Sequence, residues 1–293
     1  MSINEPCFKK LFERCCKIID ESDNQYIHNK RKKLFKYYKQ TVIEENPELQ
    51  EFYSLVHELK VYDYLKKNST NPTANNDNFA GPDFLCDFGY VECISLTKGS
   101  KNTLSREDLD NRLKGWVNRH LCEIPRIASA IKDKKEKYET YLKNKNIDEN
   151  KPRIIAVGTA IFSNEFHESL NQKNILQVLY GIGNEYLTYN QSTHEFINTP
   201  NIQTHHYDGK VKKNKNTEID LGYFFNKQYA NISAIILVSN SIFEEIKPEN
   251  FKFLLNPLAV VQINKTTIKQ FDYFHLKSIY DSDVIFEWVK KTI

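Results

Sequence analysis

The chain has 293 residues, which is enough to bury a large hydrophobic core. Hydrophobic residues make up 40%, charged residues 27% and aromatic residues 13% of the sequence, and this composition argues against an intrinsically disordered protein. The formal net charge of +3 allows a nucleic-acid partner but does not demand one, because such binding depends on a local basic surface.

The sequence indicates neither a membrane segment nor a disulfide or zinc framework. No apolar stretch is long enough to span a bilayer, and the first residues, MSINEPCFKKLFERCC, lack the apolar centre of a signal peptide. The six cysteines have no CxxC pair and no zinc-type spacing. We therefore expect reduced thiols, a cytoplasmic location and no membrane partner. Export without a cleaved signal and the oligomeric state stay open.

The first half of the chain is predicted to be helical before two strands follow. Residues 1–46 are expected to form helices and include a basic, aromatic stretch, NKRKKLFKYYKQ. Another helix is predicted to begin near Pro47, where NPELQ supplies an asparagine cap and an early proline. After a polar loop over 68–79, strands are predicted around 83–87 and 89–96, joined by a tight turn.

The second half alternates helical and strand-like segments. A helix is predicted over 120–144, followed by a strand over 153–162 whose nearly continuous apolar residues suit burial on both faces. The runs at 234–240 and 258–264 look similar, and HHYDGKVKKNKNTEID between them is expected to be an exposed basic loop. This order predicts an α/β domain with a mixed sheet.

Asp83 and Glu92 lie on the two neighbouring predicted strands. Alternation along the second strand puts Glu92 on the same face as Ile94 and Leu96. A carboxylate among apolar neighbours must be solvated, paired or metal-bound, because an isolated buried charge is costly. If the strands pair as a hairpin, the two carboxylates can converge as a hard divalent cation requires. Otherwise they are a turn aspartate and a surface glutamate.

Two helical residues could join this pair of acids. Glu58 lies beside the apolar stripe of its helix, so it either points toward the edge of the sheet or pairs with lysines of the same helix. Lys134 lies inside the apolar face of the helix over 120–144, so it either has a carboxylate partner or extends to water. Arg126, eight residues earlier, lies on about the same side.

The sequence GPDF with Asp83 and YVECIS with Glu92, preceded by Glu58 on a helix, resembles the PD-(D/E)XK nuclease superfamily. The resemblance covers about residues 50–162 and implies a restriction endonuclease-like α/β core, with a central mixed β-sheet flanked by helices. It implies one nuclease-like domain over 47–293, in which 163–293 extend the sheet, preceded by an N-terminal helical segment over 1–46.

One position departs from the family pattern. The family's usual lysine stands two residues after the second acid, and this position is Ile94. Some branches carry the lysine on the second core helix instead, and Lys134 in RIASAIKDK resembles that arrangement. Lys98 in SLTKG, in the loop after the strand, is the alternative.

The resemblance implies a metal-dependent endonuclease that hydrolyses phosphodiester bonds, above all in DNA, and the choice between DNA and RNA stays open. Asp83, Glu92 and the carbonyl of Cys93 would bind Mg²⁺ (or Mn²⁺), Glu58 would assist directly or through a water, and Lys134 would orient the attacking water or stabilise the transition state. Basic residues that could contact phosphates, or merely solubilise the surface, are Lys98, Arg126, Lys210, Lys212 and Lys213.

Two alternatives stay open. Ile94 at the lysine position favours a catalytically decayed nuclease fold that binds nucleic acid or protein. A metal-independent protein-interaction domain is the other alternative, because the fold alone does not fix the function.

Overall fold

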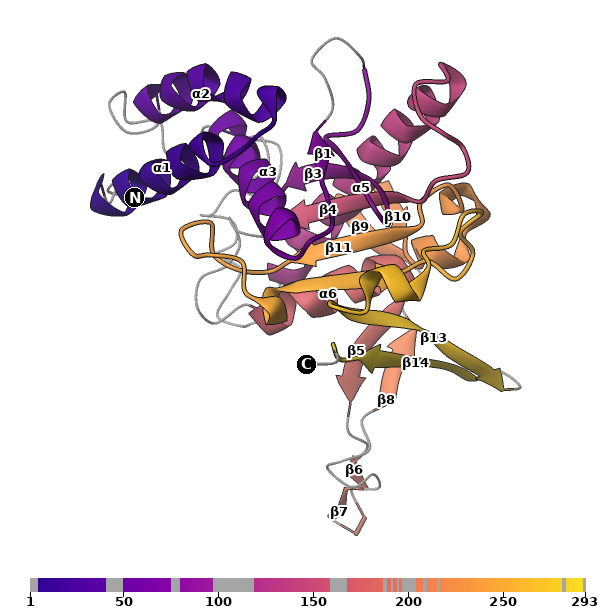
Figure 1. Ribbon diagram of the computed structural model, residues 1–293. Helices are drawn as coiled ribbons and strands as arrows, with labels where there is room; N and C mark the ends of the chain where they lie inside the picture. The colour runs from indigo at the N-terminus through magenta and orange to yellow at the C-terminus, as the bar shows by residue number, and fades with distance from the viewer. Residues whose placement is uncertain are drawn as a thin grey trace.

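The protein is described by a computed structural model that covers most of the chain. The described residues are 5–40, 50–74, 80–96, 119–158, 168–186, 189–190, 192–193, 195–196, 204–207, 210–214, 217–280 and 283–291. Within them, an eight-stranded mixed sheet forms the centre of the molecule, and five α-helices lie beside it (Figure 1). The α/β class and the mixed sheet expected from the sequence are thereby confirmed.

The strand order of the sheet is β1-β2-β3-β4-β11-β12-β13-β14. β3, β4 and β11 run parallel to one another in the middle of the sheet, and β12 and β13 are also parallel. The remaining neighbours pair antiparallel. The strands are β1 (Thr73–Ala74), β2 (Phe84–Cys86), β3 (Gly89–Ser95), β4 (Arg153–Gly158), β11 (Ala234–Val238), β12 (Phe251–Leu255), β13 (Asp272–Tyr280) and β14 (Asp283–Val289).

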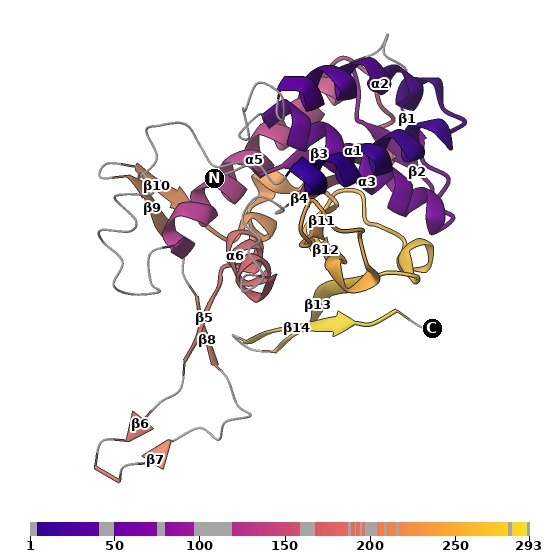
Figure 2. The same ribbon diagram turned by 90° about the vertical axis from the view of Figure 1, so that its left-hand side faces the viewer.

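The helices cover both faces of this sheet. α1 (Glu5–Asp20), α2 (Gln25–Tyr38) and α3 (Gln50–Lys67) share one buried cluster with Ile154 and Ala156 of β4. α5 (Arg119–Lys143) and α6 (Glu168–Tyr180) share the other cluster with Ile155 and Val157. Because side chains alternate along a strand, the two clusters lie on opposite faces, and Figure 2 shows the two groups of helices on either side of the sheet.

The central strands are buried on both sides, as their apolar sequences predict. All six residues of β4 and all five of β11 are buried. The predicted strands around 83–87 and 89–96 are also confirmed, as β2 and β3, and the helix predicted over 120–144 is confirmed as α5. Residues 159–162, at the end of the strand predicted over 153–162, lie outside the described residues.

Three predicted segments differ from the structure. The polar loop over 68–79 contains the short edge strand β1. The stretch expected to be a basic loop forms strands instead, with β9 and β10 paired antiparallel, because alternating residues such as Val211 and Ile219 give it a strand pattern.

The smaller strands are β5 (Ile182–Tyr186), β6 (Tyr189–Asn190), β7 (Glu195–Phe196), β8 (Thr204–Tyr207), β9 (Lys210–Asn214) and β10 (Thr217–Asp220).

The prediction of a buried strand over 258–264 is wrong. That segment is irregular, and Leu258 and Val260 are exposed. Asn256 accepts a hydrogen bond from the Leu258 N–H through its side chain, and Pro257 follows it, so the chain turns where the strand was expected. The strand lies just before this turn, as β12. Short 3₁₀ helices occupy Tyr223–Phe225, Lys227–Tyr229, Pro248–Asn250 and Lys265–Ile268.

Two further expectations can be compared with the described residues. No helix in that part of the chain is long and apolar enough to cross a bilayer. The five cysteines whose side chains are described are free thiols, as expected.

Candidate active site

The β2–β3 hairpin fixes where the two candidate acids lie. Its register pairs Cys86 with Gly89 and Phe84 with Val91, so Asp83 lies just before β2. Gly89 has a φ of +135°, and a Cβ there would lie 2.4 Å from the Pro152 carbonyl oxygen. Only glycine accommodates this turn, which therefore sets the register that brings Asp83 beside β3.

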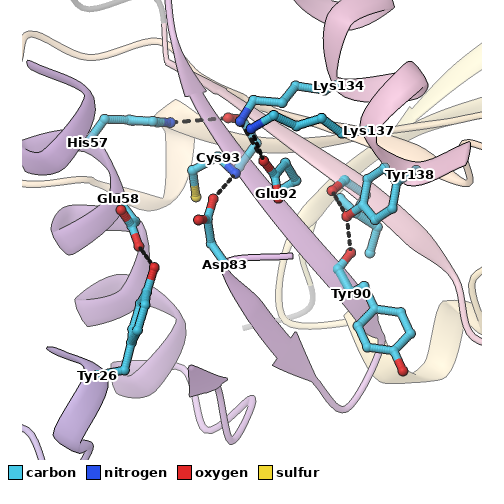
Figure 3. Close-up of polar contacts among 12 residues, drawn as sticks. Tyr26, His57, Glu58, Asp83, Tyr90, Glu92, Cys93, Lys134, Lys137 and Tyr138 are labelled. Atoms are coloured by element: carbon cyan, nitrogen blue, oxygen red, sulfur yellow. Dashed lines mark hydrogen bonds and ion pairs between the residues drawn. The ribbon is translucent and has the colours of Figure 1, made fainter. Parts of the chain in front are cut away.

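Asp83 is held by the backbone of β3. Its Oδ2 accepts a hydrogen bond of 2.7 Å from the Cys93 N–H (Figure 3). Burial raises the pKa of the Asp83 carboxyl well above its usual value, and the negative charges of Glu58 and Glu92 raise it further, against the opposing effect of Lys134. The three acids therefore lie close enough to interact, and the charge of Lys134 does not offset the effects of burial and of the neighbouring acids on Asp83.

Glu92 is the most buried of the three acids, at 2% exposure. Its Oε1 lies 2.6 Å from Lys134 Nζ and 3.2 Å from Lys137 Nζ, while its Oε2 is buried without a hydrogen-bond partner. Burial acts to lower the pKa of Lys134, but the charges of Glu92 and Asp83 outweigh it, so the pKa is raised. Lys134 thus stays protonated. Of the two possibilities for this lysine, a carboxylate partner or extension to water, the structure shows the carboxylate partner.

Lys137 is a site residue that the sequence reasoning missed. It follows Lys134 by three residues on α5, and residues at this spacing share a helix surface. Its side chain is 53% exposed, whereas that of Lys134 is 12% exposed. The i, i+3 spacing was the signal that could have identified it. α5 therefore brings one sheltered and one exposed ammonium group to the same carboxylate oxygen.

Glu58 belongs to a neighbouring ion pair. Its Oε1 lies 2.6 Å from Lys30 Nζ and accepts a hydrogen bond of 3.1 Å from the Tyr26 hydroxyl, both on α2. Glu58 points toward the side of Asp83 in Figure 3. Its ion-pair partner thus comes from another helix and not from a lysine of α3. Its influence on Asp83 is electrostatic.

The oxygen atoms at this edge of the sheet suit a hard cation. Among the described residues, no three His, Cys, Asp or Glu side chains form a ready-made metal site. Mg²⁺, however, is commonly bound by one or two carboxylates together with waters and substrate phosphates. The free Oε2 of Glu92 and the carboxylate of Asp83 have this chemistry, and a cation there would stabilise the ionised form of the buried Asp83 carboxyl.

The backbone offers a third oxygen. Continuing the Phe84–Val91 register by two residues places Pro82 opposite Cys93, and proline has no N–H to donate. The Cys93 N–H already bonds the Asp83 side chain. Because the N–H and C=O of a strand residue point to the same neighbouring strand, the Cys93 carbonyl faces Pro82 and receives no hydrogen bond from the strand pairing. The donor set fits a divalent cation.

The structure places two of the other predicted basic residues, Arg126 and Lys210. Arg126 is half-buried on α5, two turns before Lys134. Lys210 is exposed on β9, and its Nζ lies 3.4 Å from Glu218 Oε2. Lys212 and Lys213 lie on β9, but their side chains, like the whole of Lys98, fall outside the described part of the structure.

The site thus combines residues of α3, β2, β3 and α5, and its assignment rests on these contacts. Asp83, Glu92 and Lys134 come together as the sequence predicts, Glu58 lies beside them, and Lys137 joins them. Comparison of the chain with models of protein families, with curated proteins and with solved structures finds no match.

Proposed function

We propose that this protein is a metal-dependent nuclease that hydrolyses phosphodiester bonds of DNA. The observation that carries the proposal is the state of Glu92, a buried carboxylate with one oxygen on two lysines and the other without a partner. A structural ion pair would need both oxygens satisfied, because a buried unpaired polar atom is costly. The free oxygen, next to Asp83, is suited to a cation.

In this proposal Asp83, Glu92 and the Cys93 carbonyl hold Mg²⁺ or Mn²⁺. When bound, the metal neutralises charge on the scissile phosphate and lowers the pKa of the attacking water. The Cys93 N–H keeps the Asp83 carboxylate in place through its 2.7 Å hydrogen bond. Glu58 is paired with Lys30 and contributes negative charge beside Asp83.

In this proposal, Lys134 and Lys137 of α5 have different roles. Lys134 is protonated and sheltered, so its ammonium can donate to the attacking water or to the negative charge that develops in the transition state. Lys137 is half-exposed, so it can reach a phosphate that enters from solvent. Both keep Glu92 oriented. Ile94, at the family's usual lysine position, is half-buried and packs against the cluster that contains α5.

The order of elements also supports the proposal. The PD-(D/E)XK core has a first helix, a three-stranded meander, a second helix and a further strand. Among the described elements, α3, the antiparallel strands β1 to β3, α5 and β4 follow in the same order. The lysine reaches Glu92 from the second of these helices, as in the branch with the displaced lysine.

The test is cleavage of supercoiled plasmid in the presence of Mg²⁺ or Mn²⁺. The wild-type protein should nick or linearise the plasmid, a chelator should stop the reaction, and Asp83→Asn should abolish it. Asp87→Asn is the matched control, because Asp87 is an exposed residue in the turn of the same hairpin and should cleave normally. Absence of cleavage by the wild type with every divalent cation would contradict the proposal.

A decayed nuclease fold that only binds its ligand is the second candidate. It is favoured by the pairing of both lysines with Glu92, which neutralises that acid without a metal. Binding of DNA without cleavage, unchanged in Asp83→Asn, would support it. A metal-independent protein-interaction domain, in contrast, should give no heat in a calorimetric titration with Mg²⁺ or Mn²⁺.

A further inference from the structure

α2 concentrates positive charge to an extent unusual for this chain. Its sequence, QYIHNKRKKLFKYY, contains five lysine or arginine residues and no aspartate or glutamate. The whole chain has a formal net charge of only +3, so this single helix carries more net positive charge than the entire protein. Such local concentration, and not the overall charge, is what attracts a polyanion.

The cations of α2 fall into two groups. Lys30 is turned inward to Glu58, and Arg31 contacts Asp20 of α1. Lys32, Lys33 and Lys36 are exposed. In the described part of the chain, no carboxylate lies within ion-pair distance of these three, which we call the outer lysines. Their charge is therefore available to a ligand from solvent.

The outer lysines follow one side of the helix, beginning next to the site. At 100° per residue, Lys33 lies 60° from Lys30 around the helix axis, and Lys36 lies a further 60° in the same direction. Lys32 is 40° beyond Lys36. Since Lys30 Nζ is 2.6 Å from Glu58, this arc of charge starts beside the candidate acids.

Packing decides which kind of polyanion fits. Ile27 and Leu34 of α2 are fully buried in the core with α1 and α3. Phe35 is 49% exposed, but its ring packs edge-on against Phe12 of α1. One partly exposed ring is not the continuous apolar face that inserts into a bilayer. Figure 1 shows α2 as the outermost layer above α3. A row of ammonium groups without a continuous apolar face beside it suits the phosphate backbone of nucleic acid, because such contacts need charge and no pocket.

We propose that the outer lysines of α2 bind the phosphate backbone of nucleic acid and guide it to the site at Asp83 and Glu92. The inference deepens the proposed function and rests on it for the place to which the strand is guided. The binding is independent of base sequence and depends strongly on salt. Lys30 and Tyr26 anchor the helix on Glu58 and so fix the distance between this surface and the acids.

The test measures binding separately from cleavage. Full-length Asp83→Asn protein is titrated into a fluorescently labelled 30-base-pair DNA without divalent metal, at several salt concentrations, with anisotropy as the readout. Adding Lys32→Gln, Lys33→Gln and Lys36→Gln should weaken binding by at least about tenfold and reduce the slope of log K against log salt by about two to three.

The matched control removes the same charge elsewhere. Lys227, Lys247 and Lys269 are exposed lysines on the C-terminal half of the chain, and their triple glutamine variant should keep the affinity and the slope. Equal losses in the two triple variants, or none in either, would overturn the inference. If circular dichroism shows that the α2 triple variant is unfolded, the single variant Lys33→Glu is measured in its place. Unchanged affinity of the Lys33→Glu protein for DNA would overturn the inference too.

The outcomes separate this inference from the nuclease proposal. If the wild type binds DNA through the outer lysines but never cleaves it, the nuclease proposal fails and the inference stands. If the wild type cleaves plasmid but the α2 variant binds like the control, the inference fails and the nuclease proposal stands. Sedimentation of the protein with phosphatidylserine vesicles, together with no DNA binding, would also overturn the inference.

Discussion

At the scale of single residues, the site depends on how charge is shared around Glu92. Two ammonium groups meet one oxygen of this carboxylate, and the other oxygen is left for a ligand. The two lysines differ mainly in exposure, so their loss should have different consequences. Lys134 is the sheltered partner, and removing it leaves a buried charge with one half-exposed neighbour.

We therefore expect Lys134→Met and Lys137→Met to affect different kinetic constants. Lys134→Met should lower kcat for plasmid cleavage by about 100-fold, the effect of losing one donor to the transition state, and should destabilise the fold by about 3 kcal/mol. Lys137→Met should mainly raise KM, because we propose that the exposed ammonium group of Lys137 binds a substrate phosphate.

Lys132→Met is the control for both variants. Lys132 is exposed on α5 and only forms a long i, i+4 ion pair with Glu136, which contributes little to stability. Cleavage kinetics and urea denaturation measure the effects. Equal loss of kcat in the Lys134 and Lys137 variants would contradict the division of roles.

At the scale of elements, α3 lies unusually close to the sheet. A Cβ at Gly158, the last residue of β4, would lie 2.5 Å from His57 Nδ1. Three atoms of the His57 ring lie within 3.0 Å of this position, and the ring Nε2 lies 3.2 Å from the Ala156 carbonyl oxygen. Burial lowers the pKa of His57 to about 4, so the ring is neutral at pH 7 and its Nε2–H can donate to that carbonyl. The absence of a side chain at Gly158 thus sets how near Glu58 comes to Asp83.

Gly158→Ala should push α3 away from the sheet. The added methyl group overpacks a buried contact, so we expect a loss of about 1–3 kcal/mol of unfolding free energy and weaker cleavage. Combining it with His57→Ala should give a smaller loss than the two single variants predict together, because the smaller residue makes room for the methyl group. Thermal and urea denaturation measure the four proteins of this cycle, and strictly additive losses would count against a direct contact.

At the scale of the whole molecule, α3 is also tied to the segment that follows β11. Lys60 is 6% exposed, and its Nζ donates to the carbonyl oxygens of Ser241 and Ile242 at 3.0 and 3.1 Å. Burial lowers the pKa of Lys60 to about 7. Between pH 7 and the usual lysine pKa, the unfolded chain therefore binds a proton that the folded protein has released.

Lys60 should make the fold more stable as the pH rises above 7. Its contribution to the unfolding free energy should grow by up to about 1.4 kcal/mol per pH unit in this range and stay constant at lower pH. Lys60→Met removes that contribution, so the difference between wild type and variant should change between pH 7 and 8.5 but not between pH 5 and 6. Urea denaturation at these values provides the measurement, and a constant difference would contradict the lowered pKa.

The sequence was sufficient for those parts of the molecule where a local pattern decides the structure. The continuous apolar run of β4 and the turn before Gly89 predict a buried strand and a hairpin. Lys134 could be identified because a lysine inside an apolar helix face needs a carboxylate. These features depend only on neighbours in sequence.

Contacts between distant segments could not be predicted in the same way. Nothing local distinguishes Lys30 from the other lysines of α2, yet it alone is turned to Glu58. The run at 258–264 has a strand's composition, but the turn at Asn256 and the pairing of β12 with β11 exclude it from the sheet. Lys137 was overlooked because it is exposed and lies off the apolar face of α5, where nothing in the local sequence calls for a carboxylate partner.

The parallel pairing of β4 with β11 has a consequence for the order in which the molecule is assembled. Arg153 and Ser233, whose hydrogen bond lies at the start of this pairing, are 80 positions apart in the chain, whereas Lys134 and Glu92 are 42 apart. Pairings of long sequence separation form slowly, because the chain between them must be ordered first. The segment from Asp83 to the end of β4 contains both acids and, on α5, both lysines, so this part of the fold is expected to form before β11–β14 add the far side of the sheet.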